Sequence, residues 1–298
     1  MYRGKFGLKL SCLAKNIGDS IAANGKSRRL RVDPFGINVC AAPGVEGDQF
    51  RITHDNFVNF ALGKVKGVGV PVSGSGYGSL KGLFSKNIDQ SNVRPEDKKA
   101  LNGIIPDGRS DGRGVQQLEK HVTPLNNYVV LWEAKGLSTQ SESVQARADR
   151  INTDINRAAA NLDLKYPGST VLQEKMKYGE GGQYLALVTG SLGNFSSDVL
   201  ILVDFIASVQ TVRALQRCTK NEEQLFGMYR RFLVSSFGLF ASRLWARHIH
   251  DKFRDAVAVT APSNAPHSPD PDREIVRDFH LGGFRDRRAQ RFGSRRGA

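Results

Sequence analysis

The middle of the chain predicts a mixed α/β fold, in which helices flank a central sheet. Residues 128–136, YVVLWEAKG, begin with a continuous apolar run that is typical of a strand buried on both faces. A second apolar run closed by glycines, residues 182–193, predicts another strand. Between the two, apolar residues recur at helical spacing over residues 140–162, opposite a polar face. This alternation indicates layers of helices packed on a sheet.

Weaker patterns predict two short helices upstream of these elements. Residues 94–103 begin with a proline followed by acids and end at a glycine, as short helices often do. Residues 51–65 carry apolar residues after Asp55, which is a candidate N-cap. For the neighbouring His54 we therefore favour a place at the helix cap over a catalytic role.

Composition divides the chain into four regions. A Gly-rich N-terminal region precedes the predicted α/β core, and two long helical segments then form an extension that packs on this core. A Pro-, Ser- and charge-rich stretch follows and leads into an Arg-rich end, which together predict a disordered basic tail. The four regions span residues 1–90, 91–195, 196–260 and 261–298.

The charge of the chain favours an anionic partner. Lys and Arg outnumber Asp and Glu by 43 to 29, which gives a net charge of +14 at pH 7. Such an excess favours nucleic acid first and an anionic membrane surface second. Charge alone specifies no chemistry, so it indicates a class of partner and leaves the reaction open.

The remaining composition excludes several classes of protein. Cys12, Cys40 and Cys218 are far apart, which argues against a disulfide framework and against a structural zinc site. The N-terminus has no unbroken apolar segment of the kind found in signal peptides. The most apolar stretch, residues 198–209, is too short to span a bilayer and contains Asp204, so it predicts a buried helix. We expect an intracellular protein, in the cytoplasm or in the nucleus or nucleoid.

The strand at 128–136 has an unusual ending, because Glu133 and Lys135 follow its apolar run. Side chains two residues apart in a strand point to the same face, about 7 Å apart along it. Charges at the end of a buried strand are costly unless they pair or bind a ligand. The pair is therefore a candidate site for a divalent metal, held by the carboxylate, with the ammonium beside it.

A second acid is expected near Glu133, since Mg²⁺ is usually held by one or two carboxylates with waters and substrate phosphate. The segment IIPDGRSD offers Asp107 and Asp111 just after a short apolar stretch. A two-stranded unit formed by this segment and the strand at 128–136 would bring one of these acids beside Glu133. The residue spacing leaves open which of the two it is.

Pro106-Asp107, followed by Glu133-Ala134-Lys135 at the end of a buried strand, resembles the PD-(D/E)xK nuclease superfamily. This superfamily includes restriction endonucleases and Holliday-junction resolvases. The resemblance covers roughly residues 90 to 195 and implies a restriction-endonuclease-like core with the order α-β-β-β-α-β. It also implies a metal-dependent nuclease that hydrolyses phosphodiester bonds, in DNA more than in RNA.

The resemblance assigns a role to each matching residue. It implies that Asp107 and Glu133 bind Mg²⁺ or Mn²⁺, with the carbonyl of Ala134 as a third ligand. Lys135 would orient and activate the attacking water. Many members of the superfamily add an acid from the helix before the hairpin, and Glu96 is the nearest candidate in this chain.

Several arginines are candidates for contact with the nucleic-acid backbone. Those on the polar face of the helix at 140–162 form a solvated face by default, but beside a nuclease site they would reach DNA. Those of the tail are typical of a solvated end or of a salt-sensitive phosphate contact. The candidates are Arg147, Arg150, Arg157, Arg287 and Arg288.

Two other functions fit the same sequence. The first is a non-catalytic, basic nucleic-acid-binding protein or an assembly protein of a virion or mobile element, in which Glu133 and Lys135 form a structural ion pair. The second is a helical protein–protein module in which residues 195–258 form a homodimer interface. The acid-x-Lys tripeptide does not distinguish them, because it recurs at Glu96–Lys98, Asp97–Lys99 and Asp163–Lys165. None of these repeats ends an apolar strand.

Overall fold

The computed structural model describes residues 49–260, apart from residues 75–79, 81, 85–87, 89–90, 124, 126–127, 138–142, 191–192 and 220. The side chains of residues 49–50, 180 and 252–260 are also outside the description. The first 48 residues and the predicted basic tail, including Arg287 and Arg288, lie outside the described residues. The predictions made for those two segments therefore stay predictions.

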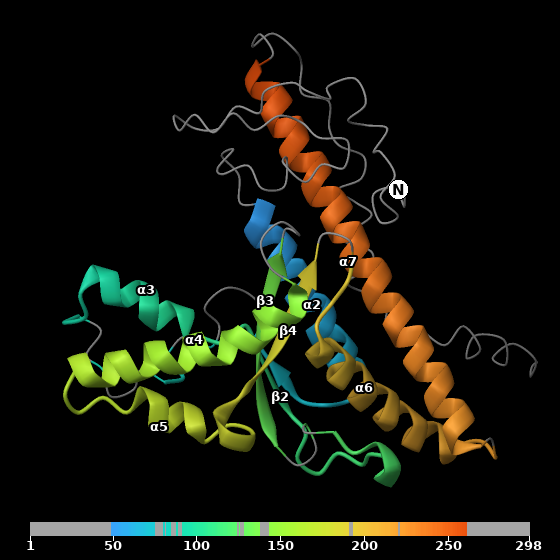
Figure 1. Ribbon diagram of the computed structural model, residues 1–298. Helices are drawn as coiled ribbons and strands as arrows, with labels where there is room; N and C mark the ends of the chain where they lie inside the picture. The colour runs from blue at the N-terminus through green and yellow to red at the C-terminus, as the bar shows by residue number, and fades with distance from the viewer. Residues whose placement is uncertain are drawn as a thin grey trace, which may run out of the picture. The chain divides into compact units, whose positions relative to one another are not determined.

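A mixed four-stranded sheet, in the order β1-β2-β3-β4, forms the centre of the described chain (Figure 1). β1 pairs antiparallel with β2, β2 pairs antiparallel with β3, and β3 pairs parallel with β4. The sequence prediction of a mixed α/β fold with helices flanking a sheet is confirmed. The strands are Val72–Ser73, Gly108–Asp111, Val129–Leu137 and Tyr184–Gly190.

The register of β2 on β3 leaves part of β3 uncovered. Gly108, the first residue of β2, lies opposite Trp132, and pairing between these strands runs from there toward Val129. β3 continues to Leu137, paired with β4 along this second half. Among the described strands, the segment from Glu133 onward therefore has a neighbour on one side only, and its other edge opens beside Glu133.

Helices cover both faces of the sheet. Alternate β3 residues point to opposite faces, as the pleat of a strand requires. Trp132 and Ala134 lie in a core cluster with residues of α2, α6 and α7, whereas Leu131 lies in a second cluster with residues of α3, α4 and α5. Figure 1 shows these two groups of helices on the two sides of the sheet. The helices are α2 (Gln49–Gly67), α3 (Pro95–Gly103), α4 (Val144–Lys165), α5 (Val171–Met176), α6 (Ser197–Leu215) and α7 (Glu222–Thr260), with single 3₁₀ turns η3 (Glu119–His121) and η4 (Glu180–Gly182).

The amphipathic helix predicted from periodicity is α4. Its N-cap is Ser143, whose side chain accepts a hydrogen bond from the backbone N–H of Ala146. The predicted apolar stripe is buried from Ala148 through Leu162, against α3 and β4. This helix therefore packs against the face of the sheet to which Glu133 points.

The apolar segment predicted as a buried helix is α6. Its apolar residues are buried against the sheet and α7, and Asp204, the acid in the middle of the run, pairs with Arg230 at 2.6 Å. Among the described residues, no helix has both the length and the apolar character that a membrane span requires.

The predicted N-cap at Asp55 is wrong. The helix begins at Gln49, so Asp55 and His54 both lie inside α2. The apolar residues after Asp55 do lie in the helix, but residues 49–54, which precede Asp55, are helical as well. Because α2 begins earlier than predicted, His54 does not lie beside a helix cap but within the helix, which packs against β3.

Candidate active site

Asp107 and Glu133 lie side by side at the open edge of β3. Asp107 immediately precedes β2, and its backbone N–H donates to the carbonyl of Trp132 at 2.9 Å. Its carboxylate accepts a hydrogen bond from the N–H of Ala134, with 2.7 Å between Ala134 N and Asp107 Oδ2. The register of β2 on β3 thus places Asp107 next to the Glu133–Ala134 peptide.

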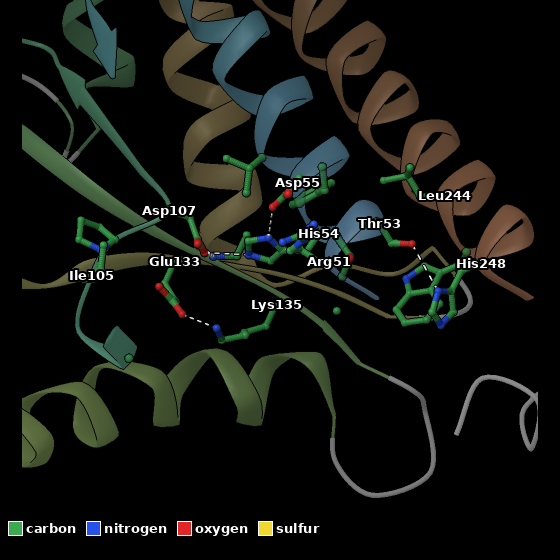
Figure 2. Close-up of a pocket in the computed structure, with 18 of the residues that line it drawn as sticks. Arg51, Thr53, His54, Asp55, Ile105, Asp107, Glu133, Lys135, Leu244 and His248 are labelled. Carbon is green, nitrogen blue, oxygen red and sulfur yellow. Dashed lines mark hydrogen bonds and ion pairs between the residues drawn. The ribbon is translucent and has the colours of Figure 1, made fainter. Parts of the chain in front are cut away.

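Glu133 is a buried carboxylate whose hydrogen bonding is incomplete. It is 4 % exposed and points with Lys135 away from α2, toward α4 (Figure 2). Its Oε1 pairs with Lys135 Nζ, but Oε2 has no hydrogen-bond partner among the described residues. Burial and the negative charge of Asp107 raise the pKa of Glu133 to about 7. Keeping this carboxylate ionised at neutral pH therefore costs free energy.

Lys135 remains a cation in this site. Burial lowers its pKa, but the charge and hydrogen bond of Glu133 outweigh burial and raise the pKa above its ordinary value. Its side chain is 39 % exposed, compared with 6 % for that of Glu133. The ammonium group can therefore meet a ligand that arrives from solvent.

His54 completes the cluster from α2. Its Nε2 lies 3.0 Å from Asp107 Oδ2 and its Nδ1 lies 3.0 Å from Asp55 Oδ1, as Figure 2 shows. Burial lowers the pKa of His54, but the hydrogen bond and charge of Asp107, aided by Asp55, outweigh it and raise the pKa to about 9. An imidazolium with both N–H groups bonded to carboxylates fits this geometry. Sequence reasoning missed this role, because the adjacent His-Asp pair was its only local signal.

A cavity of about 410 Å³ contains the cluster. It lies where β2 stops covering β3, and its walls come from α2, the end of α3, the segment before β2, the ends of β3 and β4, and α7. Its lining includes Thr53, His54, Asp107, Glu133, Lys135 and His248. The carboxylates, the lysine and the histidine thus line one cavity.

The two other acids considered from the sequence lie elsewhere. Asp111 is at the opposite end of β2, facing Val129, and binds the guanidinium of Arg113 with 2.8 Å between Arg113 Nε and Asp111 Oδ1. Glu96 is exposed on α3, 3.9 Å from Arg94, and is not among the residues that line the cavity. The structure therefore brings Asp107 to Glu133 and leaves Asp111 and Glu96 apart from it.

The candidate arginines of α4 are not equivalent. Arg150 and Arg157 both pair with Asp154, at 3.7 and 3.8 Å. Arg147 lies close enough to Lys135 for its charge to lower the lysine's pKa. The buried Nε of Arg147 has no hydrogen-bond partner among the described residues. The charge of Arg147 therefore acts on the site through Lys135.

Within the described residues, no group of three or more His, Cys, Asp or Glu side chains is arranged to hold a metal ion. The residues present do match the donor set of a magnesium site that relies on two carboxylates and completes its shell with water and phosphate. The buried, unpartnered Oε2 of Glu133 beside Asp107 is the observation that supports this fit. Comparison with protein-family models, with curated proteins and with solved structures found no match to this chain.

Proposed function

We propose that the protein is a metal-dependent nuclease of the PD-(D/E)xK type that hydrolyses phosphodiester bonds, with DNA as the favoured substrate. The observation that carries this proposal is that Asp107 and a buried, incompletely bonded Glu133 line one cavity, close enough for the charge of Asp107 to raise the pKa of Glu133. Lys135 lies on the same strand face as Glu133 and is accessible to a ligand. An acid pair and a lysine gathered in one cavity are suited to metal-assisted hydrolysis.

The order of elements supports a restriction-endonuclease-like core for this proposal. Reading α2, β1, β2, β3, α4 and β4 along the chain reproduces α-β-β-β-α-β, with α3 inserted between β1 and β2. In this assignment the helix before the hairpin is α2. His54 and Asp55, which point into the cavity from α2, then occupy the place where other members of the superfamily add an acid.

The proposed mechanism assigns a task to each residue. Asp107 and Glu133, with the carbonyl of Ala134, would hold Mg²⁺ or Mn²⁺, which supplies Lewis-acid stabilisation of charge on the phosphate. Lys135 orients the attacking water and offsets negative charge on the substrate. His54 and the Ala134 N–H both contact Oδ2 of Asp107 and so fix the orientation of this carboxylate.

The test is cleavage of plasmid and single-stranded DNA in Mg²⁺ or Mn²⁺ by the wild type, Glu133→Ala and Lys135→Ala. We expect each substitution to lower the cleavage rate by about a hundredfold or more, because Glu133→Ala removes a ligand of the proposed metal and Lys135→Ala removes the group that orients the water. Matched controls are Glu119→Ala and Lys120→Ala on η3, the same residue types outside the cavity lining.

Two outcomes would contradict the proposal. Undiminished cleavage by both Glu133→Ala and Lys135→Ala would refute the assignment of the site. Strong, salt-dependent DNA binding by a wild-type protein that cleaves nothing would favour the alternative, a non-catalytic nucleic-acid-binding or assembly protein. The net charge of +14 is the feature that supports this alternative.

A further inference from the structure

The cavity has a second half that the proposed hydrolysis does not use. One half holds Asp107, Glu133 and Lys135, and the other is lined by Thr53 of α2 and by residues of α7. Figure 2 shows Thr53, Leu244 and His248 set apart from the carboxylates at this far end. Leu244 and Trp245 give the far half an apolar wall.

A glycine on β3 allows α7 to form this wall. A Cβ built on Gly136 would lie 3.0 Å from Cζ2 of Trp245, closer than side chains normally pack. The missing side chain lets Trp245, which is almost fully buried, pack directly against the strand that carries Glu133 and Lys135. Trp245 therefore contacts β3 at Gly136, which directly follows the candidate catalytic residue Lys135.

The carboxylates are recessed within the cavity rather than presented on a flat surface. The side chain of Asp107 is 19 % exposed and that of Glu133 is 6 % exposed. α2 and α7 contribute walls on the sheet face opposite α4. A backbone phosphate that reaches these recessed carboxylates brings its sugar and base to the mouth of the same cavity.

We propose that this cavity takes one nucleotide of a single strand or a frayed strand end, with its phosphate at Glu133 and Lys135 and its base against the Leu244–Trp245 wall. A volume of about 410 Å³ falls in the range of small-molecule sites, which includes ligands of the size of one nucleotide. A base inside a duplex must first unpair and unstack, which costs a few kcal/mol. The inference rests on the proposed nuclease function and adds its substrate class, single-stranded nucleic acid.

The first test compares kcat/KM of the wild type on a single-stranded oligonucleotide, a blunt duplex of the same sequence and a closed circular duplex, in Mg²⁺. We expect the single strand to be cleaved at least about tenfold faster than either duplex, because it avoids the cost of unpairing. Equal or faster cleavage of the duplexes would overturn this inference and leave the nuclease proposal standing. Failure to cleave any of the three in Mg²⁺ or Mn²⁺ would refute both.

The second test fills the far half of the cavity. Leu244→Trp adds volume there, whereas Leu164→Trp makes the same change on α4 at a leucine that is 82 % exposed and outside the cavity lining. We expect Leu244→Trp to lower single-strand kcat/KM by about tenfold and Leu164→Trp to leave it unchanged. A folded Leu244→Trp protein with wild-type kcat/KM would overturn the inference. If Leu244→Trp fails to fold, the first test, which compares kcat/KM of the wild type on the three substrates, still decides whether the inference holds.

Discussion

Two buried carboxylates of this protein, Asp97 and Glu133, each pair with a lysine, but they are bonded very differently. Asp97 on α3 accepts hydrogen bonds at both oxygens, from Lys165 Nζ at 2.6 Å and from the hydroxyl of Tyr166 at 3.0 Å. The hydrogen bond from Lys165 lowers the pKa of Asp97. Glu133 has one oxygen paired and one without a partner among the described residues, and its pKa is raised to about 7.

The comparison shows that the acid-x-Lys tripeptide is not the functional signal. Asp163, which also lies two residues before a lysine, accepts hydrogen bonds from the backbone N–H groups of Val171 and Leu172 and so caps α5. Asp97 and Asp163 are satisfied by the fold and hold helices together. Glu133 is buried at a cost that the fold does not offset, and such unsatisfied, perturbed groups gather at functional sites.

The largest expected effect is that Glu133→Gln and Asp97→Asn change different properties: the first changes the cleavage rate and the second changes the melting temperature. Both replace a buried carboxylate by an amide of the same shape. We expect Glu133→Gln to lower the cleavage rate by about a hundredfold or more and to leave the melting temperature unchanged or higher, because it removes a desolvated charge. We expect Asp97→Asn to lower the melting temperature by several degrees, since the lowered pKa of Asp97 shows that its hydrogen bonds stabilise the charged form, and to leave cleavage within about twofold.

Thermal unfolding and a cleavage assay on the same preparations check this prediction. The prediction is contradicted if Glu133→Gln lowers the melting temperature as much as Asp97→Asn does. That result would mean that Glu133, like Asp97, holds the fold together.

A smaller effect is expected from the arginines of α4. Arg147→Ala should lower kcat/KM by about threefold to tenfold, because under the proposed function a substrate phosphate would supply the acceptor that its buried Nε lacks. Arg150→Ala, on the same helix, should change kcat/KM by less than about twofold, since Arg150 pairs with Asp154. Steady-state kinetics at one fixed salt concentration measures the difference, and equal losses in the two variants would contradict it.

The smallest effect is a difference in the pH dependence of stability. The raised pKa of Glu133 means that the folded protein binds more protons than the unfolded chain between the ordinary value of 4.5 and about 7. Its cost is therefore absent below pH 4.5 and complete above about pH 7. In EDTA, we expect the melting temperature of Glu133→Gln to exceed that of the wild type by a few degrees at pH 8 and by less at pH 5.

The pKa of Asp97 is shifted in the opposite direction to that of Glu133, so Asp97 serves as an internal reference. Its lowered pKa contributes stability above the ordinary value of 3.8, and this contribution is lost as the pH falls through the folded value. The melting temperature of Asp97→Asn should therefore lie below that of the wild type at both pH 5 and pH 8. A gap between Glu133→Gln and the wild type that does not grow from pH 5 to pH 8 would contradict the raised pKa of Glu133.

Local periodicity was sufficient to predict the centre of the fold. The apolar run of β3 and the helical stripe of α4 are read from neighbouring residues, because each pattern arises from the geometry of one element. The same alternation predicted that Glu133 and Lys135 share a face. The start of α2 was missed, because residues 49–54 show no clear helical spacing of apolar residues, and most of the stability of a helix in a protein comes from tertiary packing.

The sequence by itself determined these elements, their order and the Glu-x-Lys ending of β3. Only the tertiary structure decided which acid meets Glu133, because the register of β2 on β3 places Asp107 there and carries Asp111 to the other end of the strand. It also decided that His54 reaches Asp107 and that Trp245 closes the cavity beside Gly136. Strand register and helix packing depend on contacts between distant parts of the chain, which no local pattern encodes.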